Sequence, residues 1–190
     1  GVFPCLRCSA ECDRSSDQCG WKYRENGLTG RDTFPAKFGT DARMNKTAAI
    51  IGGGVIGGGW LARFLLNGWD IKVFDPDPAA ERKISAVLEN ARHALPMLYD
   101  NALPAEGKLT FCASLQEAVK NADWIQESVP ERLDVKHKVF AEIQTYCRKD
   151  AVIGSSTSGF KPSELQQEAV RPEQIMVTHP FNPVYLLPLI

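Results

Sequence analysis

Glycines at a fixed spacing follow the first apolar run of the chain and suggest a phosphate-binding loop. Gly52, Gly54 and Gly57 have the spacing GxGxxG directly after the run at 48–51. Between a strand and a helix, the first glycine permits a tight turn, the second lets backbone approach a pyrophosphate, and the third lets helix and strand pack closely. The amides at the helix start then face the phosphates. We therefore predict that a dinucleotide binds Gly52, Gly53, Gly54, Val55, Ile56 and Gly57.

An acidic residue completes this pattern. Asp75 lies eighteen residues after Gly57, at the end of the next apolar run. A carboxylate there accepts hydrogen bonds from both ribose hydroxyls and repels a 2′-phosphate, which favours NAD over NADP. The alternative, a glycine-rich turn followed by a helix-capping aspartate, explains each feature but not their spacing. We predict NAD as the cofactor.

Three later apolar runs are each followed by a segment rich in polar residues. These polar segments are 127–131, 155–158 and 179–183. Ligands bind beyond the carboxyl ends of strands in an open parallel sheet. His179 occupies such a position, and histidine commonly removes a hydroxyl proton while hydride leaves for a nicotinamide. Ser158 and Asn182 can hydrogen-bond the same oxygen. We predict these three residues as catalytic, with an ordinary turn histidine as the alternative for His179.

Apolar periodicity indicates the elements that position these residues. Strands are expected at 48–51, 71–74, 109–111, 124–127, 151–154 and 174–178, and helices at 55–67, 77–93, 114–121, 131–147 and 162–169. Asp77 is expected to cap the second helix, with Pro78 in its first turn. This alternation predicts an α/β fold with a Rossmann-type, doubly wound, mostly parallel sheet.

The composition disfavours several other functions. The 22 basic and 23 acidic residues leave a net charge of -1, which gives no reason to expect nucleic acid or an anionic membrane as partner. No apolar run is long enough to span a bilayer. After residue 43 only Cys112 and Cys147 occur, which suits a reducing compartment. We expect a cytoplasmic protein that acts on a small-molecule substrate.

Residues 1–43 differ in composition from the rest of the chain. They hold four of the six cysteines, namely Cys5, Cys8, Cys12 and Cys19. Cysteines this close together can bind zinc, but only Cys5 and Cys8 have a spacing that is common in zinc fingers. No metal is therefore predicted. Low apolar density favours a disordered or non-native extension instead. We expect the NAD-binding domain to occupy residues 44–190 and to be truncated at its C-terminal end.

Residues 47–190 resemble the N-terminal domain of the 3-hydroxyacyl-CoA dehydrogenase superfamily. The similarity is carried by I-G-G-G-V-I-G-G-G-W, V-F-D-P-D-P, Q-E-S-V-P-E-R-L-D-V-K-H-K-V-F, S-S-T-S and H-P-F-N-P-V-Y-L-L-P-L. Ser156 and Pro180 stand where acyl-CoA members usually have asparagine and phenylalanine, so the chain is most similar to the carnitine dehydrogenase branch. The resemblance implies NAD-dependent oxidation of the 3-hydroxyl of L-carnitine to 3-dehydrocarnitine. The alternatives are a 3-hydroxyacyl-CoA dehydrogenase, another 3-hydroxy-acid dehydrogenase and a non-catalytic nucleotide-binding module.

The resemblance also implies roles for individual residues. His179 would be the general base, with Ser158 and Asn182 holding the substrate oxygen. Glu131 and Lys136 would bind cofactor in the cleft; the alternatives are an ordinary first-turn acid and a surface lysine. The family's orienting glutamate would follow His179 by twelve residues, just past the end of the sequence. The family's helical domain, which forms the homodimer, would also lie beyond residue 190. We therefore expect a fragment that binds NAD with little turnover.

Overall fold

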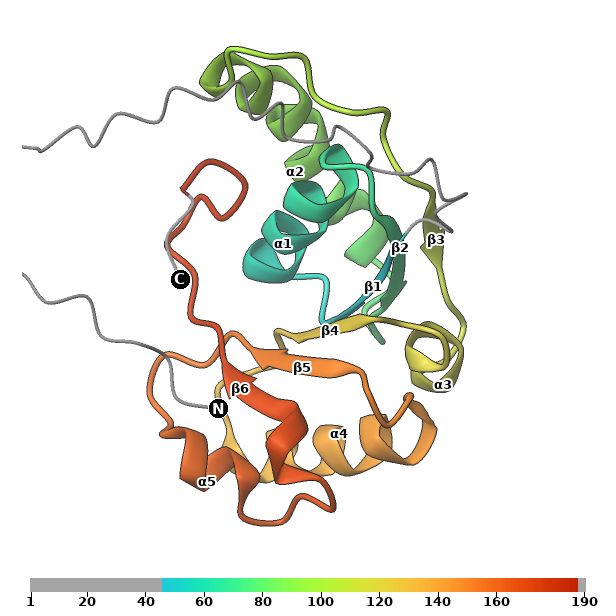
Figure 1. The fold of residues 1–190 in the computed structure, drawn as a ribbon, viewed down its shortest axis with the longest axis vertical. Coiled ribbons are helices and arrows are strands. Elements are labelled where there is room, and N and C mark those ends of the chain that lie inside the picture. Colours follow the sequence, from blue (N-terminus) through green and yellow to red (C-terminus); the bar gives the residue numbers. More distant parts are fainter. Residues whose placement is uncertain (1–45, 188–190) are drawn as a thin grey trace, which may run out of the picture. The chain divides into compact units, whose positions relative to one another are not determined.

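The computed structural model describes residues 46–187, and six parallel strands form their centre (Figure 1). The strand order is β3-β2-β1-β4-β5-β6. The prediction of a doubly wound parallel sheet is confirmed. The strands are β1 (Thr47–Ile51), β2 (Asp70–Phe74), β3 (Leu109–Phe111), β4 (Trp124–Glu127), β5 (Val152–Ser155) and β6 (Ile175–Val177).

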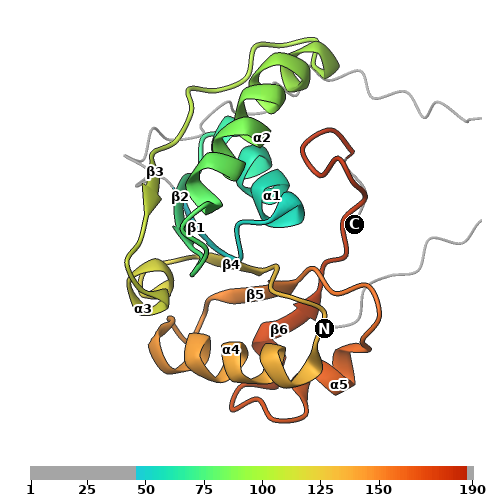
Figure 2. The same cartoon turned by 180° about the vertical axis from the view of Figure 1, so that it is seen from behind.

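Helices cover both faces of this sheet, as the two opposite views show (Figures 1 and 2). One face carries α1 (Val55–Leu66) and α2 (Ala80–Ala94), and the other carries α3 (Leu115–Val119), α4 (Leu133–Tyr146) and α5 (Pro162–Gln166). Two short 3-10 turns complete the elements, η1 (Leu95–Leu98) and η2 (Pro172–Gln174).

The burial of the central strand β1 explains the continuous apolar run at residues 48–51. Ala48 and Ile50 are buried in the core cluster under α1 and α2, while Ala49 and Ile51 are buried in the cluster under α3 and α4. Successive side chains of a strand point to opposite faces, so this strand, which is covered on both sides, presents apolar side chains to both layers of helices.

The structure shortens several predicted helices: α4 begins at Leu133 rather than at 131, and α5 ends at Gln166 rather than at 169. Asp77 does not cap α2, which begins three residues later at Ala80. The Asp77 carboxylate instead accepts a hydrogen bond from the Ala79 amide at 2.8 Å, which stabilises a turn ahead of the helix. Ser114 does cap α3 as predicted, because its hydroxyl accepts a hydrogen bond from the Glu117 amide at 3.2 Å.

The sheet reverses its winding between β1 and β4. The chain leaves β1 towards α1 on one face and leaves β4 towards α4 on the other (Figure 2). The loops after β1 and β4 touch, since a Cβ on Gly52 would lie 2.6 Å from the Ser128 carbonyl oxygen. Ligands bind at such a switch point in open parallel sheets, so the predicted glycine loop lies where a ligand is expected.

The chain after β6 returns alongside α1. A Cβ on Gly59 would lie 2.8 Å from the Val184 Cβ, and the Arg63 guanidinium donates a hydrogen bond to the Tyr185 carbonyl oxygen at 3.1 Å. These contacts hold the 179–187 segment against the helix.

Some predictions concern residues outside the described range. The four-cysteine segment and the domain boundary at 43/44 lie outside residues 46–187 and stay predictions. Within the described range, no helix combines the length and apolar character needed to cross a bilayer. The same residues contain no cluster of three or more His, Cys, Asp or Glu side chains that could hold a metal.

Candidate functional site

The glycine loop has the geometry that a bound pyrophosphate requires. Gly52 has a backbone φ of 97°, which residues with a Cβ rarely adopt. A Cβ on Gly57 would overlap the Gly52 carbonyl oxygen, so only glycine allows the helix to pack this closely. A Cβ on Gly54 would meet no atom within 4 Å, so this residue faces open space. The first turn of α1 contains no acidic residue and no side chain caps it, which leaves its amides available to an anion.

Asp75 lies opposite this loop at the end of β2. Its carboxylate accepts hydrogen bonds from the Gly53 amide at 2.5 Å and from the Asp77 amide at 2.7 Å. Because both bonds come from backbone, they hold the carboxylate in one orientation beside the glycine loop.

A cleft of about 560 Å³ runs from the glycine loop past Asp75. Its lining also includes the apolar side chains of Leu115, Val129 and Val139. A glycine loop for phosphates, a carboxylate for ribose hydroxyls and apolar side chains for an aromatic base match the parts of NAD. The described residues therefore fit the predicted cofactor.

Lys136 forms a buried ion pair that the sequence did not reveal. The Lys136 ammonium lies 2.8 Å and 3.1 Å from the two carboxylate oxygens of Glu127, and both side chains are at most 1% exposed. Glu127 also accepts hydrogen bonds from the Ser155 hydroxyl at 2.5 Å and the Val129 amide at 2.8 Å. The surface-lysine alternative is therefore wrong. The only sequence signal for Glu127 is an acid at the end of a predicted strand that would be covered on both faces.

Glu131 connects this ion pair to the turn that contains Ser158. One carboxylate oxygen accepts hydrogen bonds from the Thr157 hydroxyl at 2.5 Å and from the amides of Ser158 and Gly159 at 2.9 Å each. The other oxygen lies 3.2 Å from the Lys136 ammonium. Glu131 therefore holds the turn after β5 to the loop before α4.

These contacts change the acidity of Glu131. Burial by itself raises the pKa of this carboxyl, but hydrogen bonds from Thr157, Gly159, Ser158 and Lys136 outweigh it and lower the pKa to about 2. The carboxylate is thus ionised throughout the neutral range and acts as an acceptor only.

The lowered pKa predicts a pH-dependent contribution to stability. A depressed carboxyl pKa stabilises the folded state above the unfolded pKa of about 4.3 and loses this contribution as pH falls towards the folded value. We expect Glu131→Gln to lower the free energy of unfolding by a constant amount above about pH 5. The difference from wild type should shrink between about pH 4.3 and 2. Urea unfolding across this range measures it.

Glu173→Gln, which changes an exposed acid on η2, is the matched control. A wild-type minus Glu131→Gln difference that stays constant down to about pH 2 would show that the carboxylate is not the source of the effect.

The three predicted catalytic residues occupy neighbouring turns. Ser158 follows β5, and His179 and Asn182 follow β6. The Thr178 amide donates a hydrogen bond to the Ser155 carbonyl oxygen at 2.8 Å, so the two strand ends are adjacent. All three side chains are exposed, and within residues 46–187 no hydrogen bond joins them to one another. The structure brings Glu131, Lys136 and the Ser158 backbone together, whereas His179 and Asn182 face solvent.

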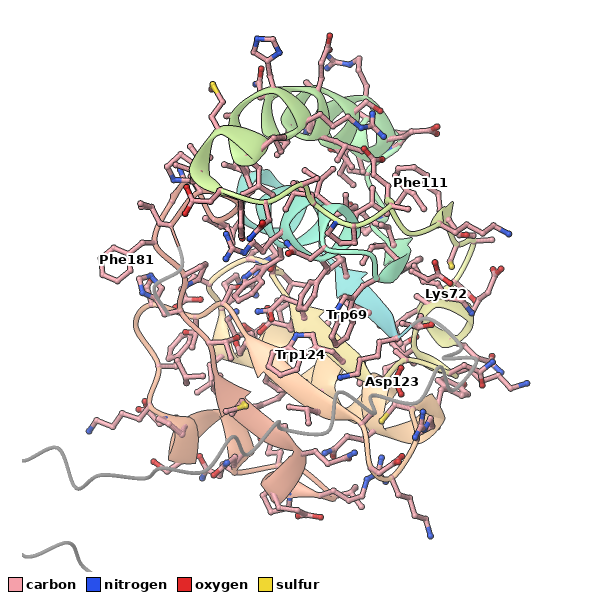
Figure 3. The ribbon with its side chains drawn as sticks, turned by 45° about the horizontal axis from the view of Figure 1, so that its top comes forward. Trp69, Lys72, Phe111, Asp123, Trp124 and Phe181 are labelled. Carbon is pink, nitrogen blue, oxygen red and sulfur yellow. The ribbon has the colours of Figure 1, made fainter. Side chains whose placement is uncertain are left out.

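An exposed aromatic ring accompanies His179. The ring centroids of His179 and Phe181 are 6.4 Å apart, and Phe181 is 53% exposed. Figure 3 shows Phe181 projecting away from the ribbon. An apolar surface therefore lies beside the predicted general base.

Known proteins show the same combination of motifs. A family model described as the NAD-binding domain of 3-hydroxyacyl-CoA dehydrogenase matches residues 47–190. A Ruegeria pomeroyi protein named L-carnitine dehydrogenase/betainyl-CoA thioesterase is 74% identical over 144 residues, which are 76% of this chain and 30% of the relative. A Mesorhizobium japonicum protein named L-carnitine dehydrogenase is 58% identical over 148 residues, which are 77% of this chain and 40% of the relative.

Two solved structures share the fold. One, described as an NAD⁺-dependent 5-formyl-3-hydroxy-2-methylpyridine 4-carboxylic acid 5-dehydrogenase, has a TM-score of 0.67 and 32% identity. The match covers 76% of this chain and 47% of that one. The Escherichia coli K12 3-hydroxybutyryl-CoA dehydrogenase has a TM-score of 0.63 and 23% identity, over 74% of this chain and 30% of that one. The chain thus spans less than half the length of each of the four proteins.

Proposed function

Because the chain belongs to the 3-hydroxyacyl-CoA dehydrogenase family and contains its NAD-binding domain, we propose that the whole protein oxidises the 3-hydroxyl of L-carnitine to 3-dehydrocarnitine. The observation that carries this proposal is the high identity to the carnitine dehydrogenases from Ruegeria and Mesorhizobium, which extends over the described domain. The placement of the glycine loop, Asp75 and His179 beyond the carboxyl ends of the strands supports it.

The reaction needs one group to accept a proton and others to hold the substrate oxygen. We assign the proton to the His179 imidazole, which is accessible at the turn after β6. The Ser158 hydroxyl and the Asn182 amide can donate hydrogen bonds to the oxygen as it becomes a carbonyl. When bound, NAD supplies the acceptor for the hydride. Removal of one proton and one hydride converts the secondary alcohol to a ketone.

The assignment of Glu131 and Lys136 to cofactor binding stays a proposal. Glu131 is partly exposed, and its Oε1 faces the Ser158 turn, so it borders the site while holding that turn. Lys136 is buried and reaches the site through Glu131 rather than directly.

The surface beside His179 supports a substrate with a quaternary ammonium. Such a cation binds favourably over an aromatic face. Phe181 offers an exposed ring, whereas Phe160 and Tyr185 are partly buried and pack against the two core clusters. We further propose a cytoplasmic homodimer, with the dimer contacts in the part of the relatives that this chain does not match.

The substrate can be tested with the full-length protein by following NADH formation. We expect turnover with L-carnitine and none with 3-hydroxybutyryl-CoA. Turnover with the CoA ester alone would retain the fold and chemistry but replace the substrate. Tight NAD binding without turnover on either compound would favour the non-catalytic nucleotide-binding module.

The cofactor preference can be tested at Asp75. Asp75→Ser removes the carboxylate that would accept hydrogen bonds from the ribose, and bonds to charged groups contribute about 1.5–3 kcal/mol. We expect the Kd for NAD to rise about tenfold to a hundredfold and the preference over NADP to narrow. Isothermal titration with each cofactor measures both.

Asp77→Ser is the control, because it alters a neighbouring carboxylate of the cleft while keeping an oxygen that can accept from Ala79. Unchanged discrimination between the cofactors in Asp75→Ser would mean that the ribose is recognised elsewhere.

A further inference from the structure

A fully buried glutamine lies behind the two catalytic turns. Gln126 belongs to β4 and is 0% exposed. It shares the α1 face of the sheet with Trp124, which packs against the apolar cluster under α1. A buried amide must satisfy its donors and acceptor to avoid a large desolvation cost. The partners of this side chain therefore indicate its role.

Gln126 hydrogen-bonds across two neighbouring strands. Its amide nitrogen donates to the Ser156 hydroxyl at 2.8 Å and to the Thr178 hydroxyl at 3.0 Å. Its carbonyl oxygen accepts from the Trp124 indole at 3.0 Å. Figure 3 shows Trp124 lying against the sheet. One side chain on β4 thus contacts the residues that immediately follow β5 and β6.

Gly154 is what allows this contact. Gly154 pairs with Gln126 on one side and with Met176 on the other, so it separates β4 from β6. A Cβ on Gly154 would lie 2.8 Å from the Gln126 carbonyl oxygen and 2.6 Å from the Thr178 hydroxyl. Any larger residue would occupy the space through which the glutamine crosses β5. The contact between Gln126 and Thr178 therefore depends on glycine at position 154.

The network ends next to the predicted catalytic residues. Thr178 immediately precedes His179, and Ser156 precedes Ser158 by two positions. The Ser156 hydroxyl also lies 2.9 Å from the Ser128 hydroxyl, and Ser128 lines the cofactor cleft. The amide of Gln126 is thus linked by side chains to the loops after β4, β5 and β6.

We propose that Gln126 is a positioning residue that sets the placement of the Ser158 turn relative to the His179 turn. The register of β5 with β6 ends at Ser155 and Val177, so the strand ladder stops before either turn. The Gln126 amide bridges the two strands just beyond that point. Its kinetic consequence rests on the proposed function, because a misplacement of about 1 Å between reacting groups can cost up to about a hundredfold in rate.

Four variants of the full-length protein test this role. Gln126→Leu removes the amide at similar volume, and Thr178→Val removes only the hydroxyl, whereas Thr178→Ser restores it. Gln144→Leu is the matched control. Gln144 is a buried glutamine of α4 that donates to the Arg171 carbonyl oxygen at 2.7 Å and makes no contact with the catalytic turns. Losing either buried glutamine should lower stability comparably.

Kinetics and amide hydrogen exchange are measured on each variant. In Gln126→Leu and Thr178→Val we expect kcat with carnitine to fall about tenfold to a hundredfold with little change in the KM for NAD. Exchange should accelerate at 156–160 and 178–182 in both. Thr178→Ser should recover most of the rate, and Gln144→Leu should retain wild-type kcat and exchange at both turns.

The outcomes separate this proposal from the proposed function. Equal losses of kcat in Gln126→Leu and Gln144→Leu would overturn it, because stability alone would then explain them. If the wild-type protein oxidises no hydroxy acid, the proposed function fails. Amide hydrogen exchange then decides whether Gln126 positions the two turns. Unchanged exchange at both turns in Gln126→Leu would then refute the positioning role, and faster exchange there but not in Gln144→Leu would support it.

Discussion

Replacing His179 with asparagine will lower kcat for carnitine oxidation by about 10²–10⁴-fold, which is the usual contribution of a general base. Asparagine keeps a polar side chain at the turn but cannot accept the hydroxyl proton at neutral pH. His179 is exposed and forms no hydrogen bond within residues 46–187, so its loss should leave the fold intact. The affinity for NAD should change by less than about twofold, because the residue lies outside the residues that line the cofactor cleft.

The measurement is steady-state NADH formation by the full-length protein, paired with NAD titration and thermal unfolding. His93→Asn is the control, since that histidine is exposed in the last turn of α2 and does not line the cofactor cleft. If His179→Asn retains more than about a tenth of the wild-type kcat, another group removes the proton and the ordinary turn-histidine reading stands.

Replacing Lys136 with methionine will lower the free energy of unfolding by about 3–5 kcal/mol, as expected when one partner of a buried ion pair is removed. Methionine fills much of the same volume, so the loss is mainly electrostatic. Glu127 would keep its bonds from Ser155 and Val129 but lose the opposite charge inside the sheet. Because the contact with Glu131 disappears as well, the Ser158 turn should also loosen.

Urea unfolding of the single and double variants measures this effect. Lys138→Met is the matched control, because Lys138 lies on the same helix but is exposed and should change stability by less than about 0.5 kcal/mol. Glu127→Gln combined with Lys136→Met removes both charges and should recover part of the loss. A loss below about 1 kcal/mol in Lys136→Met would show that water or another hydrogen-bond donor stabilises the Glu127 carboxylate in place of Lys136.

The local pattern of the sequence determined the elements and much of the cofactor site. Short segments rich in apolar residues predicted every strand of the sheet to within a few residues, and the central strand β1, covered on both faces, is apolar from Ala48 to Ile51. The glycine spacing and Asp75 can also be interpreted locally. Gly52 and Gly57 meet steric demands within one strand–turn–helix unit, Gly54 leaves space for a ligand, and Asp75 bonds to the Gly53 amide of the same loop. The start of α2 was placed three residues early because a capping aspartate and a turn-forming aspartate look alike in sequence.

Only the tertiary structure decided what lies between the strands. Three contacts depend on which strand lies beside which. They are the ion pair of Glu127 with Lys136, the hydrogen bonds from the Ser158 turn to Glu131, and the hydrogen bond from Gln126 across Gly154 to Thr178. Strand order is a property of the whole sheet and leaves no periodic signal in any one segment. Local sequence therefore determined the chemistry available at each strand end, and the order of the parallel strands determined which of those ends meet.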